Sequence, residues 1–455
     1  MEQNKRLVLL IVCDIIAAIL AILTAISIKH MKIPGVEEIQ TFGVVRIVVF
    51  TVTVVFLSFL VEIYKNHHEL IARDIAVKIG SSLGVSCFVF SIITYSSNLD
   101  EYGSGIQVSA IIIFGILQFL FHLIYRNYVK YQGFASRVVI LGVGATAGNM
   151  GALIPESDEN YLLSGYIRCS DELSEIPSDW ILENSGGIYE TVKREKADKI
   201  VVSLSERRGV FPLGDVMACK LNGVEVVDAP SFYEHITGKL FLEGINPSWI
   251  IFSNGFNVSQ VRKILKRVVD LLCAGVGIIL TVPFLPIVAL AIKLDSPGPV
   301  FYRQERVGEK ERNFFLYKFR TMKADAENGT GAVWAQKNDS RVTRTGAFFR
   351  KCRIDELPQF FNILCGEMSM VGPRPERPEF VTKLKEIIPY YSERHFVKPG
   401  VTGWAQVRYP YGASVEDAME KLRFDLYYIK NLSLTFDFMI IMETIQVVLF
   451  RRGSR

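Results

Sequence analysis

The chain has 455 residues, enough for two or three domains, and 50% of them are hydrophobic. A mean hydropathy of +0.27 beside a charged fraction of 22% indicates a membrane region joined to a soluble region. The formal net charge of +4 is too small to indicate a nucleic-acid-binding protein, whereas basic residues near apolar segments suit lipid headgroups and phosphorylated substrates. Seven scattered cysteines without Cys-x-x-Cys spacing argue against a disulfide framework and a zinc site.

Residues 1–133 predict a membrane module of four transmembrane helices. Its apolar stretches are each long enough to cross about 30 Å of hydrocarbon, and they lie at residues 7–28, 44–63, 76–95 and 106–124. Lysine and arginine gather before the first stretch, between the second and third, and after the fourth, which places both ends of the module in the cytoplasm. Asp14 lies within the first stretch, where a carboxylate either marks an ion path or faces a neighbouring helix.

Residues 134–245 predict a Rossmann-like α/β domain. A β-branched run opens into a Gly-x-Gly-x-x-Ala turn formed by Gly142, Gly144 and Ala147, where backbone amides can approach a pyrophosphate. Further strand candidates at residues 166–169, 199–204 and 224–227 alternate with helical stretches. No acid is cleanly placed to hold a ribose, so a bound dinucleotide and a purely structural or regulatory domain both remain open.

A linker at residues 246–262 precedes the last domain, residues 263–455, which begins with an apolar segment at 268–292. Pro283 and Pro286 remove amide donors and bend a helix near its middle, and cationic residues flank both ends of the segment. A bent helix that enters and leaves by the same leaflet satisfies both facts, and it keeps the downstream domain in the cytosol. A kinked helix that spans the membrane is the alternative. Residues 436–450 suit an interfacial helix or a packed terminal helix.

Two adjacent carboxylates, Asp355 and Glu356, follow a run of fixed positive charges at Arg350, Lys351 and Arg353. We expect the neighbouring arginines to hold Asp355 ionised and to take up the oxygens of a diphosphate. Pro358 suggests that Asp355 lies near the start of a helix. This pattern on a membrane-bound domain indicates phosphate chemistry at a bilayer surface.

Ordered motifs across the last domain lead to a resemblance. They are DSPGPVFYRQERVG at residues 295–308, YKFRTM at 317–322, DELPQ at 355–359, VGPRPE at 371–376 and KPGVTGW at 398–404. The set resembles the bacterial sugar transferase family, the monotopic polyprenyl-phosphate sugar-1-phosphate transferases, over about residues 262–455. With four spans and an α/β domain in front, the chain is similar to the large members that prime exopolysaccharide synthesis. It departs from the family pattern at Val282, where serine is common, and at residues 408–412.

The resemblance implies a multidomain membrane protein with an α+β monotopic catalytic domain and a two-step transfer. Asp355 attacks the sugar-bearing phosphate of a UDP-sugar of glucose or galactose type, UMP leaves, and undecaprenyl phosphate takes the sugar phosphate. Glu356 is the partner of Asp355, and both carboxylates hold Mg²⁺, which prefers oxygen ligands and substrate phosphates. The residues implied to bind phosphate are Lys318, Arg320, Arg353, Arg374 and Asp425.

The implied location is the cytoplasmic membrane of a bacterium, with the catalytic domain facing the cytoplasm. Membrane lipid, the UDP-sugar and the polyprenyl phosphate are the expected partners, nucleic acid is not, and a homodimer is left open. Two other functions compete with this interpretation. One is a non-enzymatic membrane scaffold for polysaccharide assembly, and the other is a nucleotide-sugar dehydratase or epimerase built on the α/β domain.

Overall fold

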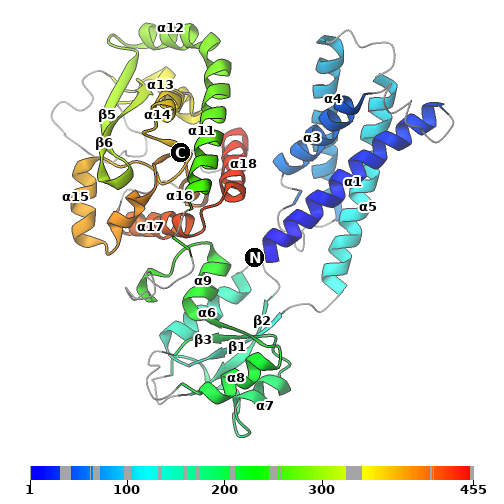
Figure 1. Cartoon of the computed structure of the whole chain (residues 1–455), viewed down its shortest axis with the longest axis vertical. Coiled ribbons are helices and arrows are strands. Elements are labelled where there is room, and N and C mark those ends of the chain that lie inside the picture. Colours follow the sequence, from blue (N-terminus) through cyan, green and yellow to red (C-terminus); the bar gives the residue numbers. More distant parts are fainter. Residues whose placement is uncertain are drawn as a thin grey trace. The chain divides into compact units, whose positions relative to one another are not determined.

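The computed structural model forms two compact units, Met1–Ala229 and Pro230–Arg455. The residues that it describes are 2–30, 43–61, 63–64, 72–96, 104–131, 136–156, 161–169, 174–204, 211–244, 255–256, 259–323, 341–409, 412 and 414–450. Most of the predicted linker at 246–262 lies outside these residues. Figure 1 labels the helices and strands of each unit.

Among the described residues, the first unit begins with the apolar helices α1 (Glu2–His30), α3 (Val44–Leu60), α4 (Ala72–Ser96) and α5 (Ser104–Tyr131), shown in Figure 1. Helix α1 buries a stripe of small residues, including Ala18, Ala21 and Ala25, in a core shared with Phe114 of α5. Spacing of three and four residues places such a stripe on one helical face. The segments Val8–Lys29 and Gly105–Arg126 are long and apolar enough to cross a membrane, whereas the apolar parts of α3 and α4 are shorter.

Asp14 faces neighbouring helices, in agreement with one of the two interpretations of this residue. Its carboxylate is fully buried and accepts hydrogen bonds from Tyr64 Oη at 2.6 Å and Gln118 Nε2 at 2.6 Å. His122 Nε2 lies 3.2 Å from Asp14 Oδ1. The same Gln118 amide also donates to Ser58 Oγ at 3.1 Å. One carboxylate thus gathers polar groups from several parts of the helical module.

A parallel four-stranded sheet with the strand order β2-β1-β3-β4 follows the helices. The central strand β1 is buried through Val138, Val139, Ile140 and Leu141, as expected when helices cover both faces of a parallel sheet. Strand β2 begins earlier than predicted. The strands and helices of this region are β1 (Ser136–Leu141), α6 (Ala145–Glu156), β2 (Tyr161–Ile167), η1 (Ser178–Trp180), α7 (Ile188–Arg194), β3 (Lys199–Val202), α8 (Leu213–Leu221) and β4 (Glu225–Asp228).

The second unit begins at Pro230, before the position that the sequence analysis gave to the end of the α/β domain. It starts with α9 (Ala229–Thr237) and η2 (Leu242–Gly244). Leu240 is fully buried in the main core of this unit, among residues that include Leu422 and Phe424. The boundary differs because Leu240 packs in the core of the second unit. The residues around Leu240 in the sequence do not indicate which core it joins.

The apolar segment of the second unit breaks where the sequence analysis placed the bend. Helix α11 (Gln260–Thr281) ends at η3 (Val282–Phe284), and α12 (Leu285–Asp295) turns off in a new direction (Figure 1). Pro283 and Pro286 lie in the first turns of η3 and α12, where a missing amide costs no hydrogen bond. Val288 and Ile292 of α12 pack with Phe319 and Phe349, so α12 returns to the domain that follows it.

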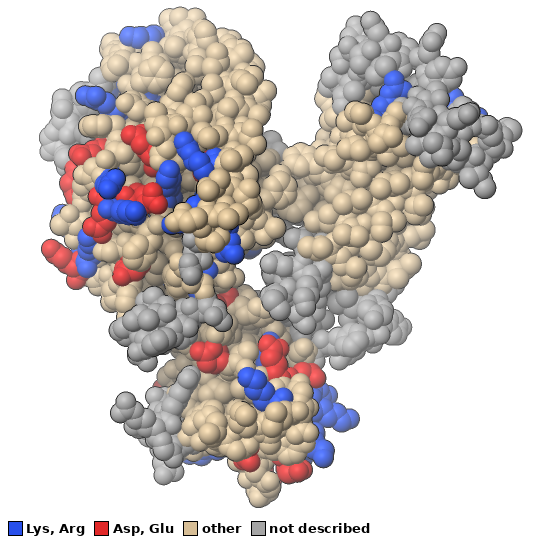
Figure 2. Space-filling view, in the orientation of Figure 1, with Lys and Arg blue, Asp and Glu red and all other residues tan. Residues whose placement is uncertain are grey.

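The outer faces of α11, η3 and α12 remain apolar and exposed, as at Leu272, Ile279, Phe284 and Ile287. Figure 2 shows a mostly uncharged surface over the outer turns of α11 and over α12, with charged residues gathered on the adjoining part of the unit. Exposed apolar area of this extent indicates a surface covered by lipid or by another protein.

The rest of the unit is an α+β domain. It is held by an antiparallel hairpin, by a short parallel pair of strands, and by a core in which helix α17 buries Leu422, Leu426 and Tyr428. The capping box of Ser414 and Asp417 starts α17. The elements are β5 (Phe301–Val307), η4 (Glu309–Glu311), β6 (Asn313–Phe319), α13 (Arg344–Lys351), η5 (Ile354–Glu356), α14 (Gln359–Cys365), β7 (Ser369–Val371), α15 (Pro378–Ile387), η6 (Tyr391–Phe396), β8 (Gly400–Thr402), α16 (Trp404–Arg408), α17 (Val415–Lys430) and α18 (Leu434–Phe450).

Candidate active site

The paired carboxylates lie on the short helix η5, between α13 and α14. Arg353 precedes them with a φ of 57°, in the left-handed region, and so reverses the chain direction after α13. This turn points Asp355 and Glu356 inward, where they are 7% and 6% exposed. Two adjacent buried carboxylates require compensating positive charge or a proton.

Glu356 receives that positive charge. Its Oε1 lies 2.9 Å from an Arg374 guanidinium nitrogen and 3.3 Å from Lys318 Nζ, and its Oε2 lies 3.1 Å from Arg353. The cations come from β6, from the turn before η5 and from the loop after β7. These residues of the predicted phosphate-binding set therefore meet at Glu356. Opposite charge close by holds the pKa of Glu356 well below its usual range, despite burial.

Asp355 differs from its neighbour. Within the described part of the chain, its carboxylate makes no hydrogen bond and no ion pair. Burial raises the pKa of Asp355, and the negative charge of Glu356 adds to this, while Lys318, Arg350 and Arg374 oppose it. The net shift of the Asp355 pKa is thus upward, because burial and Glu356 outweigh the neighbouring cations that the sequence analysis expected to favour the ionised form. Arg353 pairs with Glu356, and Arg350 donates to Thr321 Oγ1 at 2.9 Å.

Arg374 is placed by two motifs that run side by side as β7 and β8. A Cβ atom on Gly372 would lie 2.3 Å from the carbonyl oxygen of Lys398, and one on Gly403 would lie 2.2 Å from that of Gly372. Only glycine permits this approach, which explains the glycines of both motifs. The approach brings Gln406 of α16 to Arg374, whose second guanidinium nitrogen donates to Gln406 Oε1 at 2.9 Å. Sequence reasoning missed Gln406, although it lies two residues after the end of the last family motif.

Arg320 does not join the cluster at Glu356. It is 6% exposed, and its guanidinium donates to the carbonyl oxygens of Pro297 at 2.9 Å and Ser296 at 2.7 Å. These bonds fasten the turn after α12 to the end of β6. Geometry thus gives Arg320 a structural place and does not support the prediction that it binds phosphate.

Asp425 also lies elsewhere. It is 2% exposed and accepts a hydrogen bond from Arg394 at 2.8 Å. Arg394 in turn donates to the backbone oxygen of Arg374 at 3.1 Å and to Tyr391 Oη at 2.7 Å. Burial raises the pKa of Tyr391 to about 12. Asp425 therefore orients an arginine that supports the Arg374 loop, and its position does not support direct binding of phosphate.

A second buried network fastens α11 to the strand before Arg374. Lys266 Nζ lies 2.7 Å from Asp437 Oδ2 and donates to the backbone oxygen of Val371 at 3.0 Å. Asp270 accepts hydrogen bonds from Ser369 Oγ and from the Met370 amide, each at 2.9 Å. Sequence reasoning did not single out these residues. Their signal was a pair of opposite charges, Lys266 and Asp270, four residues apart on one face of α11.

The predicted nucleotide turn belongs to the first unit. Gly142 follows β1 directly, its amide donates to the Ile167 carbonyl at 2.9 Å, and Ala147 is fully buried in α6. The Gly142 amide is thus used within the sheet. Gly144 lies before α6, and its carbonyl accepts the Gly148 amide at 3.1 Å.

The donor set suits Mg²⁺ in part. Asp355 and Glu356 supply the carboxylate oxygens that this ion prefers, and a diphosphate supplies more. The oxygens of Glu356 are already engaged by cations, so Asp355 is the more accessible ligand. Across the described residues, no group of three or more histidine, cysteine or acidic side chains gathers as a complete metal site. The residues therefore fit an ion that arrives with substrate phosphates.

An apolar cavity of about 350 Å³ lies beside η5. Phe284, Ile287 and Val288 of the bent segment line one side, and Ile354 and Leu357, which flank the carboxylates in sequence, line the other. Charged and apolar side chains thus lie next to each other at this site.

Comparison with known proteins gives matches that centre on this unit. The family model for bacterial sugar transferases matches residues 261–451. A UDP-N-acetylgalactosamine-undecaprenyl-phosphate N-acetylgalactosaminephosphotransferase of Aeromonas hydrophila is 43% identical over 237 residues, 52% of this chain and 55% of that protein. A UDP-glucose:undecaprenyl-phosphate glucose-1-phosphate transferase of Xanthomonas campestris pv. campestris is 42% identical over 191 residues, 42% of this chain and 40% of that protein.

A longer match is found with the UDP-glucose:undecaprenyl-phosphate glucose-1-phosphate transferase of Escherichia coli (strain K12). It is 32% identical over 330 residues, which cover 70% of this chain and 69% of that protein. The chain thus spans about half the length of the Aeromonas and Xanthomonas relatives and more than two thirds of the Escherichia relative. The resemblance drawn from the sequence motifs is confirmed, and the chain belongs to the bacterial sugar transferase family.

Proposed function

We propose that this protein transfers a sugar-1-phosphate from a UDP-sugar to undecaprenyl phosphate and releases UMP, as the first membrane step of exopolysaccharide synthesis. The observation that carries the proposal is the arrangement of Asp355 beside a Glu356 that holds Lys318, Arg353 and Arg374 within 3.3 Å. A carboxylate next to a cluster of cations suits attack on a diphosphate, because the cations stabilise the charge that develops on the phosphate oxygens.

Asp355 is the proposed nucleophile. In the first step an Asp355 oxygen forms a bond to the sugar-bearing phosphorus, and the bond from that phosphorus to the bridging oxygen breaks, so that UMP leaves with the electron pair. In the second step an oxygen of the lipid phosphate forms a bond to the same phosphorus, and the Asp355 oxygen leaves. The carboxylate is restored, and no proton has to be transferred in either step.

Lys318, Arg353 and Arg374 are the proposed phosphate-binding residues. All of them contact Glu356. The oxygens of a bound diphosphate can therefore replace the Glu356 carboxylate as the partner of some of these cations. Asp355 and Glu356 are the proposed Mg²⁺ ligands, together with substrate oxygens. A bound Mg²⁺ ion would neutralise part of the charge on the diphosphate.

The apolar cavity beside η5 is the proposed seat of the lipid next to its phosphate, since Ile354 and Leu357 join it to the carboxylates. The break at η3 and the packing of α12 on the following domain support a helix that enters and leaves by one leaflet. We further propose that α1, α3, α4 and α5 all cross the cytoplasmic membrane, that the parallel sheet is a Rossmann-like domain, and that the catalytic domain faces the cytoplasm.

The sugar is proposed to be a hexose of glucose or galactose type. The relatives named above act on UDP-glucose or UDP-N-acetylgalactosamine, according to their names. Incubation of membranes containing the chain with UDP-glucose, UDP-galactose and their N-acetylated forms, with UMP as the measured product, identifies the preferred donor.

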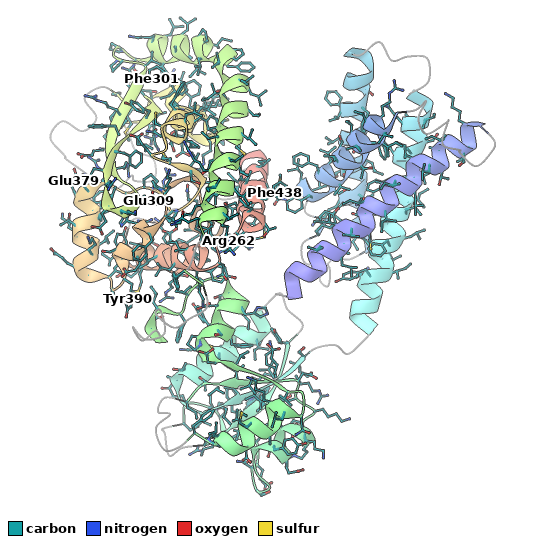
Figure 3. The ribbon with its side chains drawn as sticks, in the orientation of Figure 1. Arg262, Phe301, Glu309, Glu379, Tyr390 and Phe438 are labelled. Carbon is teal, nitrogen blue, oxygen red and sulfur yellow. The ribbon has the colours of Figure 1, made fainter. Side chains whose placement is uncertain are left out.

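The test of the function uses the full-length chain in membranes with undecaprenyl phosphate. UMP release should require the lipid phosphate and should be lost in D355N, while expression and membrane insertion persist. The matched control is E379Q, which changes a side chain that is 58% exposed, on α15 at the outer edge of the unit (Figure 3), and should retain activity. Turnover in D355N would refute Asp355 as the nucleophile, and absence of UMP with every donor would refute the proposed reaction.

A further inference from the structure

Residues 230–244, called the strap here, lie in the chain between the sheet of the first unit and the apolar helix of the second. They comprise most of α9, the turn after it and η2, and they follow β4 directly in the chain. The match to the bacterial sugar transferase model begins only at residue 261, so the strap lies outside it. The strap is nevertheless part of the second unit, which begins at Pro230.

The strap is fastened along α17 by buried and charged contacts. The Leu240 side chain is fully buried, and the Leu240 amide donates to the Arg423 carbonyl at 3.1 Å. Glu234 pairs with Lys430 at 2.7 Å. Two further ion pairs, Lys239 with Glu420 and Glu243 with Arg423, fix the turn and η2. A buried leucine together with several ion pairs makes this a held segment rather than a loose linker.

The same strap holds a residue of the last family motif. Trp404 is 5% exposed, and its Nε1 donates to the backbone oxygen of Gly238 at 2.7 Å. Gly238 has a φ of +66°, and a Cβ atom there would lie 3.2 Å from Trp404 Cζ2. Glycine is required because the chain turns through the left-handed region against the indole ring. The Arg408 guanidinium lies 4.3 Å from the centre of the Trp404 ring on the same short helix.

Helix α16 connects this contact to the cation cluster. It runs only from Trp404 to Arg408, so Trp404 and Gln406 belong to a single turn of backbone. Gln406 accepts the hydrogen bond from Arg374 at 2.9 Å, and Arg374 pairs with Glu356 at 2.9 Å through its other guanidinium nitrogen. A continuous set of contacts thus leads from the strap to the carboxylates, through one rigid turn of helix.

We propose that Trp404 and Gln406 are positioning residues for Arg374, and that the strap sets their position through the hydrogen bond from Trp404 to Gly238. The inference rests on the proposed function, because it assigns a role in the same reaction. Arg374 acts on the phosphate, and Gln406 fixes the direction of its guanidinium. A displacement of about 1 Å in such a group can cost about 100-fold in rate.

The test measures kcat and KM for the preferred UDP-sugar with the full-length chain in lipid vesicles. Q406A should lower kcat by about 100-fold at an unchanged KM, since an interaction that acts on the transition state is lost. Q406E keeps an acceptor oxygen for Arg374 and should recover most of the rate. W404F keeps the aromatic packing but removes the donor to Gly238, and it should lower kcat by about tenfold.

The second readout is whether the rate losses of W404F and Q406A combine in the double variant. If Trp404 acts through Gln406, the double variant W404F/Q406A should be no slower than Q406A alone. Rate losses that multiply would overturn the proposal, because they would mean independent roles. Wild-type turnover in Q406A would overturn it as well.

G238A tests the strap itself, and G223A is its matched control. Both positions have a positive φ, +66° and +91°, but a Cβ atom at Gly223 meets no atom within 4 Å. Both variants carry the same kind of backbone strain, and only G238A presses on Trp404. G238A should lower kcat as W404F does while G223A does not, and equal losses in both would refute the role of the strap. A wild-type chain that releases no UMP would refute the proposed function itself, whatever the variants do.

Discussion

Arg374 donates to Glu356 Oε1 at 2.9 Å and, through its other guanidinium nitrogen, to Gln406 Oε1 at 2.9 Å. A planar guanidinium can hold two acceptors in fixed directions at once, whereas an ammonium group is a single point charge. The pairing therefore makes Arg374 both a cation and a rigid spacer between η5 and α16.

Replacement of Arg374 by lysine should lower kcat by about 100-fold, because the charge is kept but its direction is lost. UMP release by the full-length chain is the measurement. R377K is the control, since the Arg377 side chain lies 3.7 Å from Glu379 at the start of α15. A lysine variant with normal turnover would mean that charge alone suffices at this position.

Activity should depend on pH through Asp355. The nucleophile must be ionised, and burial raises its pKa, so turnover should fall on the acidic side at a higher pH than for an ordinary aspartate. Lys318 is the charge that opposes this rise most. K318M should therefore raise the pKa of Asp355 further and move the acidic limb of the kcat/KM profile, which reports the free enzyme, to higher pH.

The control for that shift is K385M. Lys385 pairs with Glu311 at 2.7 Å on the surface, and its loss should leave the acidic limb where it is. An acidic limb that stays in place in K318M would mean that Asp355 is not the titrating group.

The buried pair of Asp425 and Arg394 should contribute to stability rather than to phosphate binding. D425A leaves the Arg394 guanidinium buried without its carboxylate, which should cost about 3–5 kcal/mol of unfolding free energy. The thermal midpoint of the purified protein should fall accordingly. The double replacement D425L/R394M removes both charges and should recover much of the loss. A D425A protein of normal stability and no activity would restore the phosphate-binding prediction.

The polar network around Asp14 should hold the first helices together. D14A removes the acceptor of the hydrogen bonds from Tyr64 Oη and Gln118 Nε2, and loss of the partner of a buried polar group costs about 1–3 kcal/mol. A lower thermal midpoint is expected, with a smaller loss in D14N. S91A, at an exposed serine that donates to the Cys87 carbonyl of its own helix, is the control and should have no effect. Equal stability of D14A and wild type would make the network dispensable.

The proposed cytoplasmic location of the catalytic domain can be checked at Cys365, an exposed free cysteine at the end of α14. In a chain with the other cysteines replaced, a membrane-impermeant maleimide should label Cys365 in inside-out vesicles and leave it unlabelled in intact cells. Labelling in intact cells would mean that the apolar segment crosses the membrane completely and that the domain lies outside.

The sequence predicted correctly those features that depend on a few neighbouring residues. The prolines at 283 and 286 forecast a break in the apolar helix, and the structure has one at Val282–Phe284. Alternating strands and helices forecast a parallel sheet, and β2-β1-β3-β4 is one. A proline removes a backbone hydrogen bond at its own position, and strands and helices follow from patterns in short stretches of residues. Both features can therefore be inferred from the sequence.

Other assignments depended on distant parts of the chain. Lys318, Arg353 and Arg374 meet at Glu356, while Arg320, only two residues from Lys318, turns to the carbonyl oxygens of Ser296 and Pro297. The motif contains all of these charges, but it does not reveal their partners. Likewise the sequence predicted that Asp425 serves the phosphate site, whereas in the structure Asp425 pairs with Arg394.

The sequence alone determined the family, the paired carboxylates and the apolar surfaces, because each is expressed in consecutive residues. Only the tertiary structure decided which carboxylate takes the cations, which core receives Leu240, and that Trp404 bonds to Gly238. These outcomes depend on packing and burial between segments far apart in the chain, and burial also sets the direction of the Asp355 pKa.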